Sequence, residues 1–184
     1  LSVQGFGFLL PGEIRMYNYF VNGDSRSYSY ARASYESFLT TSVGGFWYDK
    51  LSERVGFIVV PADTTVNAPS VTIFDRLAEY GSETDGADGL AHYRAVYESP
   101  ENRYRVFTLV PGATLTGSAG ANETIEVSVP VASEGFEATY ERTVQTNATG
   151  AYSVTVPYPG TYTIGGETVD VSEAAVQAGE TIRA

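Results

Sequence analysis

The run Ile125-Glu126-Val127-Ser128-Val129-Pro130-Val131 has an apolar side chain at every second position from Ile125 onwards. Successive side chains of a β-strand point to opposite faces of a sheet, so this period of two predicts a strand with one buried and one solvated face. Tyr152, Val154 and Val156 repeat the pattern. Further strands are predicted over residues 92–98, 103–109, 136–144, 161–164 and 168–171.

Turn-forming residues separate these strands. Asn147 to Gly150 and Pro157 to Gly160 are loop signals, and Gly165-Gly166 is a two-residue hairpin signal. Ser172 to Gly179 predicts a capped helical turn. Short strands at this spacing predict a small antiparallel sandwich, whose buried side chains include Val127, Val129, Val154, Val156 and Tyr162.

The first half of the chain has helical periodicity instead. It predicts a helix over 27–40 capped by Asp24 or Ser25, a helix over 47–55 ended by Gly56, and a helix that begins after Ser70 and ends at Gly81. A buried strand, 57–60, lies between the last two. The pattern changes at the glycine-rich residues 84–89. The expected fold class is α+β: a small α/β segment over residues 1–89, then an antiparallel β-sandwich over residues 90–184.

The amino-acid composition excludes several classes of function. The chain has 22 acidic and 11 basic residues, for a net charge of −11. Nucleic-acid binding needs clustered Lys or Arg, so a nucleic-acid partner is excluded. There is no cysteine, which excludes disulfides and thiolate chemistry. Lys50 is the one lysine among the basic residues, and this acidic, arginine-biased composition favours a protein of a salt-rich medium.

No run approaches the ~20 apolar residues that span a bilayer. The chain opens on an apolar stretch, Phe6 to Leu10. We therefore expect a segment that follows a membrane region in a longer membrane protein.

Several local sequences resemble one family in order along the chain. They are Ile73-Phe74-Asp75-Arg76-Leu77, Tyr80-Gly81-Ser82, residues 90–99 (Leu-Ala-His-Tyr-Arg-Ala-Val-Tyr-Glu-Ser), Val110-Pro111-Gly112-Ala113, Val156-Pro157-Tyr158 and Val171-Ser172-Glu173. Together they resemble the C-terminal globular part of the archaeal oligosaccharyltransferase catalytic subunit, over roughly residues 70–184. Members of this family are membrane enzymes that move a lipid-linked glycan onto asparagine.

The resemblance implies a position on the extracytoplasmic side of the cell membrane, attached to a transmembrane region. It implies the acceptor peptide or the lipid-linked glycan as further partners, and Mn²⁺ or Mg²⁺ in an active full-length member, held on loops between membrane helices. The family's active-site run Trp-Trp-Asp-Tyr-Gly is missing, since Trp47 is the sole tryptophan. We therefore expect a non-catalytic portion of such an enzyme, with no cofactor, metal or catalytic residue of its own.

Candidate binding residues are Trp47, Tyr48 and Asp49, in the nearest counterpart of that run, together with Arg15 and Tyr19 in or beside a stretch rich in Tyr, Asn and Arg. Packing is the alternative for Trp47, because large aromatic side chains mostly fill cores and interfaces. Asn122-Glu123-Thr124 and Asn147-Ala148-Thr149 are N-glycosylation acceptor triplets beside predicted loops.

Other groups invite a functional and a structural interpretation. Glu98 and Glu101 are either a glycosidase pair or part of a solvated turn. Asp85 and Asp88 offer oxygen ligands to Ca²⁺ but depart from the EF-hand pattern. His92 is either part of a catalytic relay or a packing residue. The alternative function is a cell-envelope β-sandwich module that binds peptide or carbohydrate, or a structural spacer.

Overall fold

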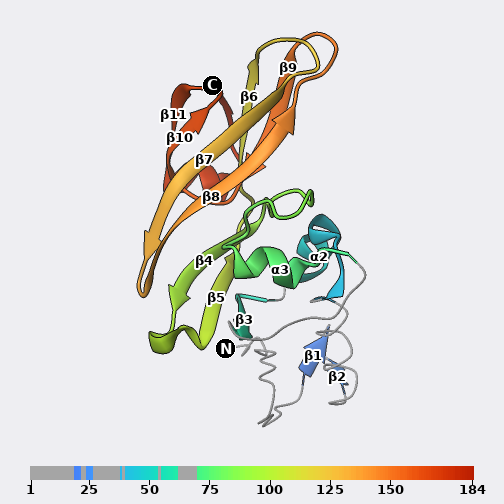
Figure 1. The fold of residues 1–184 in the computed structure, drawn as a ribbon. Coiled ribbons are helices and arrows are strands. Elements are labelled where there is room, and N and C mark those ends of the chain that lie inside the picture. The colour runs from blue at the N-terminus through green and yellow to red at the C-terminus, as the bar shows by residue number, and fades with distance from the viewer. Residues whose placement is uncertain (1–18, 22–23, 27–37, 39, 54, 62–69) are drawn as a thin grey trace.

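Strands dominate the computed structural model, which describes residues 19–21, 24–26, 38, 40–53, 55–61 and 70–184 (Figure 1). A hairpin of β1 (Tyr19–Val21) and β2 (Asp24–Arg26) comes first. The strands β3 (Phe57–Pro61), β4 (Tyr93–Glu98) and β5 (Tyr104–Leu109) form an antiparallel sheet in the order β3-β5-β4. The short 3-10 helix η1 (Pro100–Asn102) joins β4 to β5.

Two sheets form the sandwich. One has the order β11-β10-β7-β8 and the other the order β12-β6-β9. Their members are β6 (Ala113–Ser118), β7 (Thr124–Ser133), β8 (Phe136–Gln145), β9 (Ala151–Val156), β10 (Gly160–Ile164), β11 (Glu167–Val171) and β12 (Thr181–Arg183). The helix α4 (Glu173–Ala178) precedes β12. The predicted α+β class is confirmed, although β12 pairs with β6 in parallel and makes that sheet mixed.

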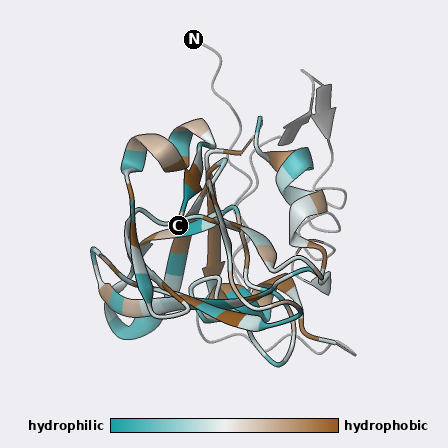
Figure 2. Ribbon diagram, turned by 90° about the horizontal axis from the view of Figure 1, so that it is seen from above, coloured by the Kyte–Doolittle hydropathy of each residue, from teal (hydrophilic) through white to brown (hydrophobic). Residues whose placement is uncertain are grey.

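The predicted alternation decides which side chains form the sandwich core. Val127, Val129, Val154, Val156 and Tyr162 are all buried. Hydrophobic and hydrophilic residues follow one another along the strands in Figure 2. The Gly165-Gly166 turn joins β10 to β11 as predicted, with φ positive at both glycines. By contrast, the turn 157–160 carries the chain from one sheet to the other, because β9 pairs with β6 and β10 pairs with β7.

The helices α2 and α3 lie in the described part of the first half. The helix α2 (Gly44–Leu51) begins and ends earlier than predicted, and Gly56 does not end it, because the Ser52 N–H already closes the last turn on the Tyr48 carbonyl. The helix α3 (Ile73–Ala78) is capped by Thr72 rather than Ser70. The Thr72 hydroxyl accepts from the Asp75 N–H while the Asp75 carboxylate accepts from the Thr72 N–H, which satisfies two donors that a helix start leaves open.

Three further predictions concern the first helix, the domain boundary and membrane-spanning segments. Residues 27–37 and 39 of the first predicted helix lie outside the described residues, whereas Phe38 and Thr40 are helical. Asp24 and Ser25, its proposed caps, lie in β2. The strand β3 pairs with β5 across the predicted boundary between residues 89 and 90, so the division into two domains stays a prediction. No helix in the described ranges is long and apolar enough to cross a membrane.

A set of contacts that we call the latch joins the two halves. At the tip of the β7–β8 hairpin, the Glu134 carbonyl accepts from the Glu98 N–H on β4 at 3.0 Å. The carboxylate of Glu98 is buried and accepts from Arg105 Nε at 2.6 Å and from the Tyr80 hydroxyl at 2.7 Å. Phe136 stacks on Tyr80 at 4.9 Å between ring centroids. The buried charge of Glu98 is therefore paired with Arg105 and further hydrogen-bonded by Tyr80, the kind of partners that a buried charge requires.

Candidate functional site

The predicted binding residues Trp47, Tyr48 and Asp49 all lie on α2. The Trp47 ring is half-buried and meets Phe38 edge to face at 5.7 Å between centroids. Asp49 is exposed. Tyr19 lies in β1, and Arg15 lies outside the described residues. Three of the five candidate binding residues are thus close together, because they are consecutive residues of one short helix.

The Tyr48 ring stacks on His92, with 4.0 Å between the ring centroids. His92 Nδ1 lies 2.9 Å from the Pro111 carbonyl oxygen, which can only accept, so Nδ1 carries the proton. Burial lowers the pKa of His92. A histidine held in this way between a tyrosine ring and the backbone acts as a packing residue rather than as the base of a catalytic relay.

Glu98 and Glu101 do not form a catalytic pair. Glu98 is buried in the latch, so its assignment to a solvated turn is wrong, whereas Glu101 is exposed and pairs with Arg103 at 2.6 Å. Sequence alone could not reveal the burial of Glu98, because it depends on Tyr80 and Arg105 from other elements.

Asp85 and Asp88 are exposed in the loop before β4. The Asp88 main-chain carbonyl accepts from Nη1 of the buried Arg76 at 2.8 Å, which fixes the loop to α3. In the ranges that the structure describes, no three His, Cys, Asp or Glu side chains come together as a metal site.

Both acceptor triplets lie at one end of the sandwich. Asn122 and Asn147 are exposed in neighbouring turns, and the Asn122 N–H donates to the Asn147 carbonyl at 3.2 Å. The side-chain oxygen of Asn147 accepts from the N–H and the hydroxyl of Thr149, at 2.8 and 2.7 Å. This asparagine turn fixes the side-chain oxygen of Asn147, and the use of either asparagine as a glycosylation acceptor stays a prediction.

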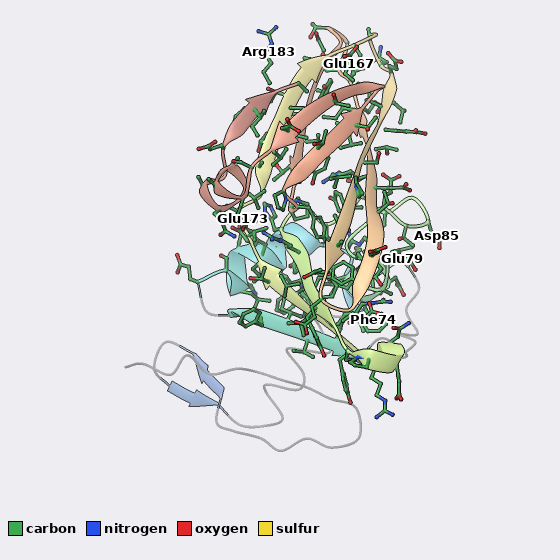
Figure 3. The ribbon with its side chains drawn as sticks, turned by 90° about the vertical axis from the view of Figure 1, so that its left-hand side faces the viewer. Phe74, Glu79, Asp85, Glu167, Glu173 and Arg183 are labelled. Carbon is green, nitrogen blue, oxygen red and sulfur yellow. The ribbon has the colours of Figure 1, made fainter. Side chains whose placement is uncertain are left out.

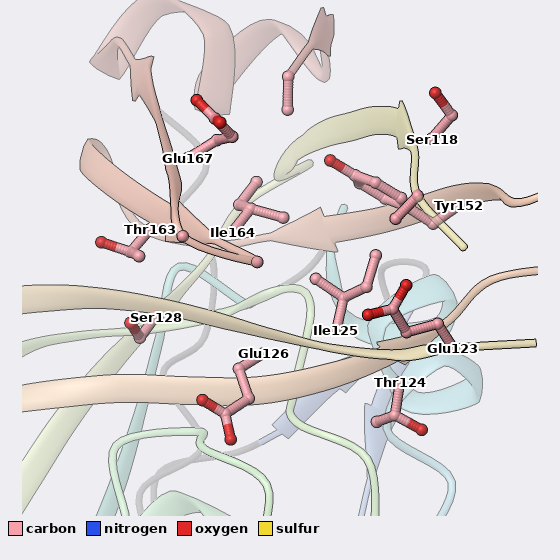
Figure 4. A pocket seen from close by; sticks show the side chains of 14 residues that line it. Ser118, Glu123, Thr124, Ile125, Glu126, Ser128, Tyr152, Thr163, Ile164 and Glu167 are labelled. Atoms are coloured by element: carbon pink, nitrogen blue, oxygen red, sulfur yellow. The ribbon is translucent and has the colours of Figure 1, made fainter.

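The same end of the sandwich contains a cavity of about 430 Å³, which we call the end cavity (Figure 4). Its lining residue Glu167 lies at the top of Figure 3, well away from Phe74 of α3. Its walls combine an aromatic ring, aliphatic side chains, hydroxyls and carboxylates. Sequence reasoning did not find it, because its residues come from five strands and the turns between them.

Comparison with known protein families found a match for one part of the chain. Residues 112–182, from the turn before β6 to the end of the sandwich, match the family model described as "Archaeal glycosylation protein B long peripheral domain". The predicted resemblance to archaeal oligosaccharyltransferases is confirmed. The matched residues include both acceptor triplets and every residue that lines the end cavity except Ala184, whereas α2, α3, β3, β4 and β5 precede them.

Solved structures of the Archaeoglobus fulgidus oligosaccharyltransferase share this fold over 81% of the present chain. A complex with Zn and sulfate gives a TM-score of 0.59 at 16% identity and is covered over 36% of its length. A form tethered to an acceptor peptide with the NVT sequon gives 0.62 at 17% and 33%. A complex with an inhibitory peptide and a dolichol-phosphate gives 0.61 at 16% and 32%. The chain thus spans about a third of these proteins, and no curated protein sequence matches it.

Proposed function

We propose that the chain belongs to the extracytoplasmic C-terminal region of an oligosaccharyltransferase-like membrane enzyme of protein N-glycosylation, and that it is a non-catalytic portion of that enzyme. The match of residues 112–182 to the peripheral domain carries this proposal. The shared fold over 81% of the chain supports it. The proposed partners are the transmembrane remainder of the enzyme and the acceptor peptide or lipid-linked glycan.

The distribution of reactive groups supports a non-catalytic role. The chain has one tryptophan and so lacks the family's active-site run. His92 and Glu98 hold the fold together through Pro111, Tyr48, Arg105 and Tyr80. The family resemblance implies that an Mn²⁺ or Mg²⁺ would be held by loops between membrane helices.

The helix α2 and the strand β3 present the proposed contact with the rest of the enzyme. Val43, Phe46 and Phe57 are large apolar side chains that are 45% to 56% exposed. Val43 and Phe46 lie together at the start of α2, whereas Phe57 lies on β3. Adjoining exposed apolar side chains mark an interface more often than isolated ones do, so Val43 and Phe46 are the side chains that support this contact. In this proposal Trp47, Tyr48 and Asp49 lie beside that interface.

The isolated chain is expected to transfer no glycan. To measure this, the isolated chain is incubated with lipid-linked oligosaccharide, Mn²⁺ and a labelled Asn-x-Thr peptide. The mass of the peptide is then followed. Membranes that contain the full-length parent enzyme serve as the positive control. Glycopeptide formation by the chain above a boiled sample would contradict the non-catalytic assignment.

A cell-envelope module that binds carbohydrate or peptide is the second candidate function, and the end cavity favours it. The two candidates differ in what the parent gene encodes. Several transmembrane segments upstream favour the transferase, whereas repeated sandwiches favour the envelope module.

Salt should stabilise the fold. The net charge of −11 leaves an acidic surface, and the screening length grows from ~3 Å at 1 M salt to ~30 Å at 0.01 M. Repulsion between the carboxylates is therefore expected to lower the melting temperature as KCl is withdrawn. Thermal unfolding followed by circular dichroism at several KCl concentrations measures this, and a melting temperature that is indifferent to KCl would remove the case for salt adaptation.

A further inference from the structure

We propose that the folded chain accepts an N-linked glycan at Asn147 and not at Asn122. Each asparagine begins an acceptor triplet, and all three residues of both triplets are exposed, so exposure does not separate the two sites. The contacts around the triplets separate them, because they decide which triplet can leave the fold without breaking the sandwich. This inference concerns the chain as an acceptor and does not rest on the function proposed above.

The reaction defines what an acceptor triplet must do. Nδ2 of the asparagine forms a bond to the anomeric carbon of a lipid-linked oligosaccharide and releases one proton. The bond from that carbon to the lipid phosphate breaks, and the phosphate leaves with the electron pair. The asparagine and the hydroxyl residue two positions later must both enter the active site of the transferase, so the triplet has to open locally first.

The contacts of the Asn147 triplet lie almost entirely within one turn. The side-chain oxygen of Asn147 accepts from the N–H and the hydroxyl of Thr149, at 2.8 and 2.7 Å, and from the Ala151 N–H at 3.0 Å. The triplet lies between the two strands, because β8 ends at Gln145 and β9 begins at Ala151. Opening the turn gives these groups to water and leaves the pairing of β8 with β7 intact.

The Asn122 triplet runs into the sheet instead. Its third residue, Thr124, is the first residue of β7 and lies opposite Gln145 of β8. Its second residue, Glu123, is bonded twice to Thr146. The Glu123 N–H donates to the Thr146 hydroxyl at 2.8 Å, and the Thr146 N–H donates to the Glu123 carbonyl at 2.9 Å. Opening this triplet would therefore separate the end of β7 from β8.

Thr146 fixes this triplet from a buried position. It is 2% exposed, and its hydroxyl also donates to the Gly120 carbonyl at 2.6 Å. Ile125, the residue that follows the triplet, is buried in the core. Opening the triplet would break the hydrogen bonds of Thr146 and let water reach the core beside Ile125, which costs more than opening a solvated turn.

Glycan transfer to the folded chain tests the proposal. The chain is incubated with membranes of an archaeon that N-glycosylates its proteins, which supply the transferase and the lipid-linked oligosaccharide. Mass spectrometry then measures the rate of modification at each asparagine. Free peptides of residues 118–128 and 143–153 correct for the different sequences around the two sites. Relative to its free peptide, Asn147 is expected to react about tenfold faster than Asn122 or more, which corresponds to about 1.4 kcal/mol.

Three results would overturn the proposal. The first is an equal relative rate at the two sites, and the second is no transfer to Asn147 in the folded chain. The third is failure of the 118–128 peptide as an acceptor, because the selection would then come from the sequence and not from the fold. None of these results bears on whether the chain is itself part of a transferase.

Two variants of one residue test the role of the Thr146 hydroxyl. Thr146→Val keeps the shape of the side chain without its hydrogen bonds, and it is expected to raise the rate at Asn122 by about threefold or more. Thr146→Ser keeps the hydroxyl and should leave that rate unchanged. Native NMR spectra establish that each variant folds. An unchanged rate at Asn122 in the folded valine variant would show that Thr146 does not protect this site and would overturn its assignment.

Discussion

Replacing Gly135 with alanine is expected to destabilise the chain by about 3 kcal/mol or more, through both backbone strain and steric overlap. Gly135 has a φ of +92°, which side chains rarely allow. A Cβ atom there would stand 1.9 Å from the Glu98 carbonyl oxygen, which is backbone and cannot turn aside. The β7–β8 tip would have to leave β4, and the buried carboxylate of Glu98 in the latch would become exposed to water.

Gly166→Ala is the matched control. Gly166 has almost the same φ, +93°, but no atom within 4 Å of the position that a Cβ would take. Its replacement should cost only the backbone strain, about 1–2 kcal/mol. Urea unfolding of both variants measures the difference in the free energy of unfolding. Equal losses would show that the tip of the hairpin does not press on β4.

The sandwich could be predicted because its strands alternate regularly. β6 escaped prediction because Gly117 interrupts the apolar series that Ala113 and Leu115 begin. The strand β12 is only three residues long, and what identifies it is its parallel pairing with β6. Both strands form through pairing with residues that are far away in the sequence. The local period of apolar residues does not reveal such pairing.

The helix boundaries show the same limit. The helix α2 starts at two glycines, which sequence rules place outside helices. Tertiary contacts explain this start, because a Cβ on Gly44 would stand 2.7 Å from Leu90 Cδ2 and the Gly44 carbonyl accepts from the Tyr93 hydroxyl at 2.8 Å. The cap of α3, by contrast, was readable in principle, since Thr72 and Asp75 have capping-box spacing.

The end cavity lay beyond sequence reasoning because register creates it. Gly117 and Tyr152 meet only when β6 and β9 pair with Leu115 opposite Val154. Shifting that register by one residue would turn every side chain of a strand to the other face. The acceptor triplets at Asn122 and Asn147 could be identified from their residues, but their closeness to each other could not.

Replacing Val154 with aspartate should destabilise the sandwich by several kcal/mol, enough to unfold it at low salt. Val154 is 3% exposed and lies opposite Leu115 in the core, so the new carboxylate would be buried with no cation provided for it. The chain would either protonate that group or open the sheet, and both cost free energy.

Ser153→Asp adds the same charge one residue earlier and should change the free energy of unfolding by no more than about 0.5 kcal/mol. Ser153 is exposed and lies opposite Thr116, so its replacement keeps the carboxylate in water. Comparing the two variants therefore separates the effect of the strand face from the effect of the charge, because the net charge and the strand are the same and the two positions are adjacent. The free energies of unfolding of the two variants are compared by urea titration. The titrations are done at high KCl, where the repulsion between surface charges is screened. Similar midpoints for the two variants would mean that β9 does not bury the face of Val154, and the pairing of Gly117 with Tyr152, on which the end cavity depends, would lose its support.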